Sequence, residues 1–173
     1  VVVDTTGVLS GKTIKSIKAG GAYRTCAIAS DDQAYCWGFN GNGELGNNST
    51  INSLVPVAVY TAGVLSGKTI KSIATGGSHN CVIASDDQAY CWGMNRSGPL
   101  GNNSSTSSSV PVAVNTTGVL NGKTIKSISA SSEHTCAIAS DNLAYCWGKN
   151  DYGQLGNGLG GNSYVPVFVF ASP

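Results

Sequence analysis

The chain repeats itself three times, and this repetition limits its possible folds more than any other feature of the 173 residues. The segment 7–17 returns at 63–73 and at 118–128, about 55 residues further on each time. Two further blocks recur in the same order, and their first copies lie at residues 26–38 and 55–59. We therefore expect one repeat domain over residues 1–173, with repeats at 7–62, 63–117 and 118–173.

Each repeat has the features of four β-strands. Short runs rich in Ile, Val, Tyr and Trp are bounded by Gly, Asn, Asp and Ser, which is typical of strands and turns. In the first repeat these runs lie at 13–19, 25–29, 34–38 and 55–59. Pro56, second in the last run, suits a strand start or a sheet edge. Four strands in a unit of about 50 residues predict an all-β fold of propeller blades, each a four-stranded antiparallel sheet.

The six cysteines form three pairs with one spacing. They are Cys26 and Cys36, Cys81 and Cys91, and Cys136 and Cys146. A hairpin with a three-residue loop at 30–32 places the first pair directly opposite each other, which suits a disulfide. The third loop residue then needs a left-handed backbone, which Asn142 tolerates well and Asp32 and Asp87 less well.

Free buried thiols and a zinc site are the alternatives to disulfides. A zinc site needs four ligands, usually with two of them a few residues apart, and this spacing does not supply them. We favour disulfides, which indicate an oxidising compartment. The expected location is therefore extracellular or at the cell surface.

Charge and hydrophobicity exclude some partners. The net charge is +1 and only 11% of the residues are charged, so we expect no nucleic-acid partner, because non-specific binding depends on excess Lys and Arg. Apolar runs are only a few residues long, which predicts no membrane insertion. The hydrophobic fraction of 41% is enough to build a core.

The third repeat carries the most complete set of motifs. They are His-Thr-Cys-Ala-Ile at 134–138, Trp-Gly-Lys-Asn at 147–150, Gly-Gln-Leu-Gly at 153–156, and Pro166. Together with their counterparts in the other repeats they resemble the repeat of the regulator of chromosome condensation family, over essentially the whole chain. The resemblance implies a β-propeller, and the cysteine pairs look like those of secreted bacterial versions of the repeat.

The chain also departs from this family. Arg24 stands where the family has His, and Asp32, Asp87 and Asn142 stand where it has a turn glycine. The family usually closes about seven blades, whereas this chain has three repeats. Nucleotide exchange on a small GTPase and chromatin binding belong to particular full-ring members, so the resemblance does not extend them to this chain.

Several segments look like ligand sites but fit the repeat better. Residues 7–13 are one position short of a phosphate-binding loop and precede a strand rather than a helix. The Gly-x-Gly-x-x-Gly match at 41–46 keeps only its last two glycines in the other repeats, which indicates turn glycines. His79 and His134 share one repeat position and are interpreted as structural. We expect no catalytic residue, no cofactor and no metal, and thus no enzyme.

The Tyr-Cys-Trp segment recurs in all three repeats, first at 35–37. Alternation along a strand places Tyr and Trp on one face and Cys on the other. We favour packing between blades for these aromatic residues. A set of aromatic platforms for sugars is the alternative.

Three blades alone form an open arc with two uncovered end faces and free strand edges. The chain is then either part of a longer protein or associates head to tail, as a ring or a filament. The last copy of the Val-Pro-Val run, residues 165–170, differs by carrying Phe168 and Phe170. We expect it to be an extra terminal strand donated to another subunit, beside the truncated copy at Val1–Val3. The expected interface residues are Val1, Val2, Val3, Val165, Val167, Phe168, Val169 and Phe170.

These expectations define a function. The preferred interpretation is a non-enzymatic extracellular structural subunit that binds copies of itself as a homo-oligomer. The alternative is an extracellular binding module, an adhesin, lectin or protein inhibitor, that binds protein or glycan through blade loops.

Overall fold

The computed structural model describes residues 3, 5–21 and 23–170, and this part of the chain contains three four-stranded antiparallel sheets. After a short 3-10 helix, η1 (Gly7–Leu9), the first blade comprises β1 (Ile14–Gly20), β2 (Arg24–Ala29), β3 (Ala34–Gly38) and β4 (Ser53–Ala58). The second comprises β5 (Ile70–Thr75), β6 (His79–Ala84), β7 (Ala89–Gly93) and β8 (Ser108–Ala113). The third comprises β9 (Ile125–Ala130), β10 (His134–Ala139), β11 (Ala144–Gly148) and β12 (Ser163–Phe168). The predicted blades are confirmed.

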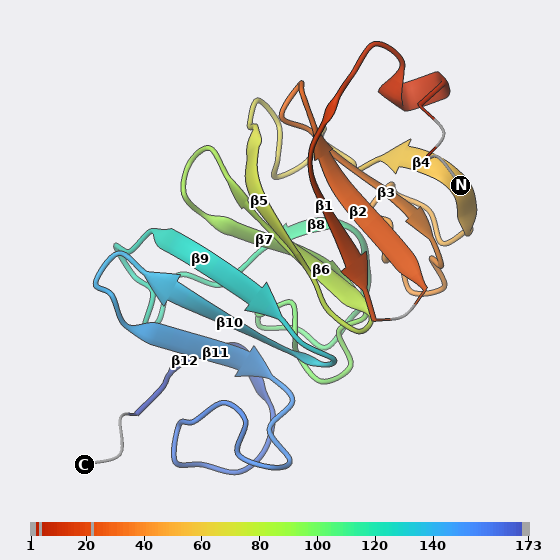
Figure 1. Cartoon of the computed structure of the whole chain (residues 1–173). Coiled ribbons are helices and arrows are strands. Elements are labelled where there is room, and N and C mark those ends of the chain that lie inside the picture. The colour runs from red at the N-terminus through yellow and green to blue at the C-terminus, as the bar shows by residue number, and fades with distance from the viewer. Residues whose placement is uncertain (1–2, 4, 22, 171–173) are drawn as a thin grey trace.

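Each sheet is a meander in which neighbouring strands follow each other in the chain. Figure 1 shows the three blades side by side, the first in red to orange, the second in yellow to green and the third in cyan to blue. The first strands of the three blades, β1, β5 and β9, line a hollow of about 480 Å³ that includes Lys18, Ser72 and Lys126. No helix in the described ranges has the length and apolar character to cross a membrane.

The hairpin register agrees with the sequence. Cys26 lies opposite Cys36 and Ile28 opposite Ala34, and the same pairing recurs in the other two blades. The third loop residue is left-handed in each hairpin, with φ of 57° at Asp32, 59° at Asp87 and 65° at Asn142. The predicted left-handed backbone at the third loop residue is therefore confirmed.

The fourth strand differs from its predicted bounds. β4 begins at Ser53, so Pro56 lies inside the strand rather than near its start. Proline is tolerated there because β4 pairs only with β3 and forms the edge of its sheet. A register shift between β3 and β4, opposite the Cys36–Gly38 segment, explains why the strand extends further than the apolar run suggests.

The prediction that residues 165–170 form an extra terminal strand is wrong in one respect. Residues 163–168 form β12, the ordinary fourth strand of the third blade, paired to β11 through Tyr145 and Phe168. Without it β11 would expose an unpaired edge, just as β3 and β7 would without β4 and β8. The third Val-Pro-Val copy is thus required to complete the third sheet.

The core lies between the blades. One face of each blade carries the Tyr and Trp of its third strand, here called the aromatic face, and the other carries the cysteine pair, here called the disulfide face. Cys26 and Cys36 of the first blade pack with Tyr90 and Trp92 of the second. Cys81 and Cys91 pack in the same way with Tyr145 and Trp147. The predicted packing of these aromatic residues between blades is confirmed for the second and third repeats.

Candidate functional site: the blade junctions and the two open faces

A tryptophan fixes the distance between neighbouring blades at each of the two junctions. Trp92 Nε1 donates to the backbone oxygen of Glu44 at 2.8 Å, and Trp147 Nε1 donates to that of Pro99 at 2.8 Å. The same two oxygens accept a second hydrogen bond, from Asn80 Nδ2 at 2.6 Å and from Thr135 Oγ1 at 2.9 Å. One backbone carbonyl per blade therefore receives two side chains of the next blade.

Glycine makes room for this tryptophan. Gly46 has a φ of +67°, and a Cβ atom there would lie 2.7 Å from Trp92 Nε1. Gly101 has a φ of +65°, and its Cβ would lie 2.7 Å from Trp147 Nε1. Both the left-handed backbone and the close contact exclude a side chain. The interpretation of these residues as turn glycines is confirmed, with interblade packing as the second reason for them.

Arg24 connects the first blade to the second. Its guanidinium donates to the backbone oxygens of Gly76 (3.0 Å), Gly77 (2.6 Å) and His79 (2.6 Å), and to Asn80 Oδ1 (3.0 and 3.1 Å). Burial lowers the pKa of Arg24 to about 10, which the nearby Glu44 carboxylate opposes. The side chain therefore remains a cation at neutral pH, compensated by oxygen atoms of the next blade.

His79 occupies the same place at the second junction. Its Nε2 lies 2.8 Å from Thr135 Oγ1, and the Thr135 hydroxyl donates to Pro99 O. A hydroxyl has a single proton, so His79 Nε2 is the donor and the ring is the neutral Nε2–H tautomer. Burial, followed by the charges of Arg24 and His134, lowers the pKa of His79 to about 3.

The two junctions therefore use matched pairs: Arg24 with Asn80, and His79 with Thr135. Arg24 and His79, and likewise Glu44 and Pro99, occupy repeat positions that vary, and all four are buried between blades. Their variation follows the residue opposite them in the next blade.

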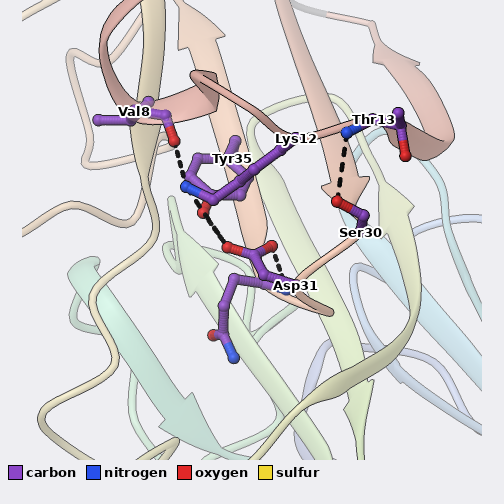
Figure 2. A network of polar contacts seen from close by, with 7 residues as sticks. Val8, Lys12, Thr13, Ser30, Asp31 and Tyr35 are labelled. Carbon is purple, nitrogen blue, oxygen red and sulfur yellow. Dashed lines mark hydrogen bonds and ion pairs between the residues drawn. The ribbon is translucent and has the colours of Figure 1, made fainter.

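The Gly-Lys-Thr segment forms a structural clamp (Figure 2). Lys12 Nζ lies 5.1 Å from the centre of the Tyr35 ring and 3.5 Å from Asp31 Oδ2, and it donates to the backbone oxygen of Val8. Tyr35 Oη donates to Asp31 Oδ2 at 2.6 Å. Burial tends to raise the pKa of Asp31, but the hydrogen bonds from Tyr35 and the Gln33 backbone, and then Lys12, bring it below its usual value.

The same clamp recurs in the other blades, with Lys68, Asp86 and Tyr90 in the second and Lys123, Asp141 and Tyr145 in the third. Each lysine is followed by a strand and contacts its own blade. This arrangement agrees with a repeated turn at residues 7–13 rather than a phosphate-binding loop.

All three predicted disulfides are present, joining Cys26 to Cys36, Cys81 to Cys91 and Cys136 to Cys146. The first two are fully buried within the junctions. The third lies on the uncovered disulfide face of the last blade, where Cys136 is half-buried. Within the described ranges, no group of three or more His, Cys, Asp or Glu side chains is arranged to hold a metal ion.

The first blade has an uncovered aromatic face. Trp37 and Thr25 are half-buried there, whereas their counterparts Trp92, Trp147, Asn80 and Thr135 are fully buried. Tyr23 is 89% exposed and Leu54 is 99% exposed at the rim of the same face. We call this surface the open aromatic face.

The third blade has an uncovered disulfide face. His134 is half-buried, Ile138 is 44% exposed, and a hollow of about 390 Å³ lies beside Ser129 and Cys136. Tyr152, on the turn that carries Gln154, is 93% exposed. Burial lowers the pKa of His134. We call this surface the open disulfide face.

The predicted interface residues are only partly placed. Val1 and Val2 lie outside the described residues, and Val3 is half-buried. Phe168 packs edge-on against Tyr145 with ring centres 5.8 Å apart, and Phe170 against Phe168 at 5.5 Å. Phe168 thus covers the junction inside the chain, while Phe170 remains exposed. A role of this segment in subunit contact stays a prediction.

The residues of the two open faces were not identified as interface residues from the sequence. The missed residues are Tyr23, Thr25, Trp37, Leu54, His134, Tyr152, Gly153 and Gln154. The counterparts of Thr25, Trp37, His134, Gly153 and Gln154 are fully buried in a junction, and those of Tyr23, Leu54 and Tyr152 are less exposed than these three side chains. Aligning the repeats and asking which copies lack a neighbouring blade would have identified all eight.

Comparison with known proteins gives a consistent result. The model of the regulator of chromosome condensation (RCC1) repeat matches residues 31–83, 86–138 and 141–173. The chain is 33% identical over 150 residues to the ultraviolet-B receptor UVR8 of Arabidopsis thaliana, covering 87% of this chain and 32% of the receptor. It is 30% identical over 165 residues to human E3 ubiquitin-protein ligase HERC2, covering 94% of this chain and 3% of the ligase.

Solved structures show the same fold. Prp20p of Saccharomyces cerevisiae superposes with a TM-score of 0.80 at 22% identity, over 95% of this chain and 40% of that one. Human WBSCR16 superposes with a TM-score of 0.78 at 24% identity, over 95% of this chain and 42% of that one. The chain thus spans less than half the length of each of these relatives and structures.

Proposed function

Because the chain belongs to the regulator of chromosome condensation (RCC1) repeat family, we propose that it is a structural subunit that builds larger propeller-like assemblies. Its blades associate head to tail, with the open disulfide face of one subunit against the open aromatic face of the next. The subunit is non-enzymatic. It acts outside the cell, where its three disulfides are stable.

One observation carries this proposal. Each inner junction buries the Trp of one blade against the disulfide of the preceding blade, and the first and third blades each leave one half of such a junction uncovered. Trp37 lies on the open aromatic face of the first blade, and Cys136 and Ile138 lie on the open disulfide face of the third. Uncovered apolar faces of this kind favour association, because covering them removes apolar surface from water. A head-to-tail contact produces a ring if its rotation closes and a filament if it does not.

Donation of residues 165–170 to a neighbour is a second route to the same assembly. β12 is already paired to β11, so donation must first break those backbone hydrogen bonds. Stacking of the open faces leaves every strand in place and is the preferred route. Assembly that survives deletion of residues 165–173 would exclude donation, because donation requires this segment.

Sedimentation analysis of the purified chain across a range of concentrations tests the proposal. We expect discrete multiples of the mass of a single chain without any added ligand, and electron microscopy then distinguishes rings from filaments. A single chain at every soluble concentration would contradict self-assembly.

A protein-binding or glycan-binding module is the second candidate. Ile51 and Leu159 are exposed apolar residues on the long loops that precede β4 and β12. Yeast RCC1 (Prp20) has been solved with Kap60 bound, although its likeness to this chain extends to the fold alone. Specific binding to a glycan array or to a defined protein, retained by the isolated subunit and lost on Ile51→Ser, would favour this candidate.

A further inference from the structure

We propose that the partner of each open face is a second copy of this chain, docked in the register of the inner junctions, so that His134 of one subunit pairs with Thr25 of the next. This inference rests on the proposed self-assembly and adds which residues meet. It follows from three sets of contacts that occur at both inner junctions and have their two halves on opposite ends of the chain.

The first set is the matched polar pair. His134 occupies the repeat position of Arg24 and His79, and Thr25 occupies that of Asn80 and Thr135. At the inner junctions Arg24 faces Asn80 and His79 faces Thr135. The two end residues therefore reproduce the His–Thr combination. A His opposite an Asn, or an Arg opposite a Thr, occurs at neither inner junction.

The second set is the tryptophan and its carbonyl acceptor. Trp37 is the counterpart of Trp92 and Trp147, and Gln154 is the counterpart of Glu44 and Pro99. Docking in register brings Trp37 Nε1 and Thr25 Oγ1 to the backbone oxygen of Gln154. Gly156, with a φ of +61°, supplies the position without a side chain that Gly46 and Gly101 supply inside the chain.

The third set lies at the rim. Gly43 and Gly98 are buried, and a Cβ atom would lie 2.4 Å from Ser109 Cα at the first and 2.8 Å from Ser163 O at the second, both in the next blade. Their counterpart Gly153 is exposed with nothing within 4 Å of its Cβ position. Leu54, the counterpart of Ser109 and Tyr164, is 99% exposed and would cover Gly153 in the docked pair.

Two exposed tyrosines support the same register. Ser97 of the second blade donates to Glu133 of the third at 3.2 Å. The counterparts of these residues at the ends of the chain are Tyr152 and Tyr23, which are among its most exposed side chains. Docking in register places the two rings together, which removes both from water and allows aromatic packing.

One repeat position at the proposed contact between subunits differs from its counterparts at the inner junctions. Gln33 and Gln88 donate across the inner junctions to the backbone oxygens of Lys68 and Lys123, at 3.3 and 3.4 Å, but the third blade has Leu143 there. Leu143 is an exposed apolar residue in the isolated subunit. The junction between subunits thus exchanges one weak hydrogen bond for apolar contact.

A steric block tests the register. Gly153→Asn adds a side chain where the subunit has open space, and Asn tolerates the left-handed φ of +74°. Gly67→Asn is the matched control, because Gly67 has a φ of +69°, open space around its Cβ position and no place in the proposed contact between subunits. We expect Gly153→Asn to raise the dissociation constant at least about tenfold and Gly67→Asn to leave it unchanged.

A pair transplant tests the identity of the contact. His134→Arg alone is expected to weaken association about tenfold, because the guanidinium would be buried opposite Thr25. Adding Thr25→Asn recreates the Arg24–Asn80 pair between subunits and is expected to restore most of the affinity. Thermal unfolding of each variant checks that the subunit itself is intact.

The outcomes separate the two proposals. Wild-type assembly that neither Gly153→Asn nor His134→Arg weakens would overturn this register while leaving self-assembly standing. A wild-type chain that stays single at every concentration would overturn both and leave blades outside this chain as the occupants of the open faces. Weakening by Gly153→Asn with rescue by the double variant would support both.

Discussion

At the scale of single residues, the junctions depend on side chains whose chemistry is unusual for their burial. Arg24 is a buried cation surrounded by oxygen atoms, and His79 is a buried neutral ring held by Thr135. His79 Nδ1 is buried and has no hydrogen-bond partner. Burial in a site closed to water disfavours protonation of this ring most, and the nearby Arg24 cation disfavours it further, which is why the pKa of His79 is so low.

The first prediction concerns pH. Above pH 6.5, His79 is neutral in both the folded and the unfolded chain, so it adds no pH dependence. As the pH falls from 6.5 toward 3, the unfolded chain binds a proton that the folded chain does not, so the folded state loses stability. The unfolding equilibrium constant should rise up to about tenfold per pH unit, as measured by urea unfolding between pH 6.5 and about 5.

Two variants give the control for this prediction. His79→Gln is expected to flatten the slope, because glutamine does not titrate. His134→Gln is expected to change it less, because His134 is half-buried in the isolated subunit. An unchanged slope in His79→Gln would contradict the assignment to this residue.

At the scale of elements, each blade is a simple meander with one aromatic face and one disulfide face. The polar pairs connect β2 to β6 and β6 to β10. Apolar packing and the Trp–carbonyl hydrogen bonds are the same at both junctions. The matched pair is the variable part, so it is the element that can specify which blade follows which.

The second prediction concerns this pair inside the chain. Arg24→His should lower the free energy of unfolding by about 1–3 kcal/mol, since backbone oxygens of the second blade lose their donors. Adding Asn80→Thr recreates the His79–Thr135 pair at the first junction. A double-mutant cycle by urea unfolding should show a favourable coupling of about 1 kcal/mol, whereas strict additivity would contradict matched pairing.

At the scale of the whole molecule, the chain is three blades with two unlike ends. The open aromatic face and the open disulfide face are two halves of the junction that the chain forms twice internally. The same asymmetry distinguishes its disulfides, because Cys136 is half-buried on the open face while both inner disulfides are fully buried.

The third prediction concerns those disulfides. Mild reduction under native conditions should open Cys136–Cys146 before the two inner pairs, because attack by a thiolate requires access to a sulfur atom. Alkylation followed by mass mapping measures the order. Reduction of all three pairs at one rate would contradict the burial difference, and slower opening at concentrations that favour assembly is expected if a second subunit covers the face.

The sequence by itself determined the local structure, because strands, turns and hairpin register depend on neighbouring residues. The repeats, the alternation of Tyr and Trp against Cys, and the opposition of Cys26 and Cys36 all follow from spacing along one strand or hairpin. Spacing along the sequence did not predict that Pro56 lies inside β4, because proline is tolerated there only where the strand forms the edge of its sheet.

Only the tertiary structure decided what the variable repeat positions do. Arg24 and Asn80 are 56 positions apart, as are His79 and Thr135, and each pair is brought together by the packing of one blade on the next. The same packing determines that Trp37 and His134 remain uncovered while their counterparts are buried. Burial depends on which blade lies opposite, and no property of a single repeat contains that information.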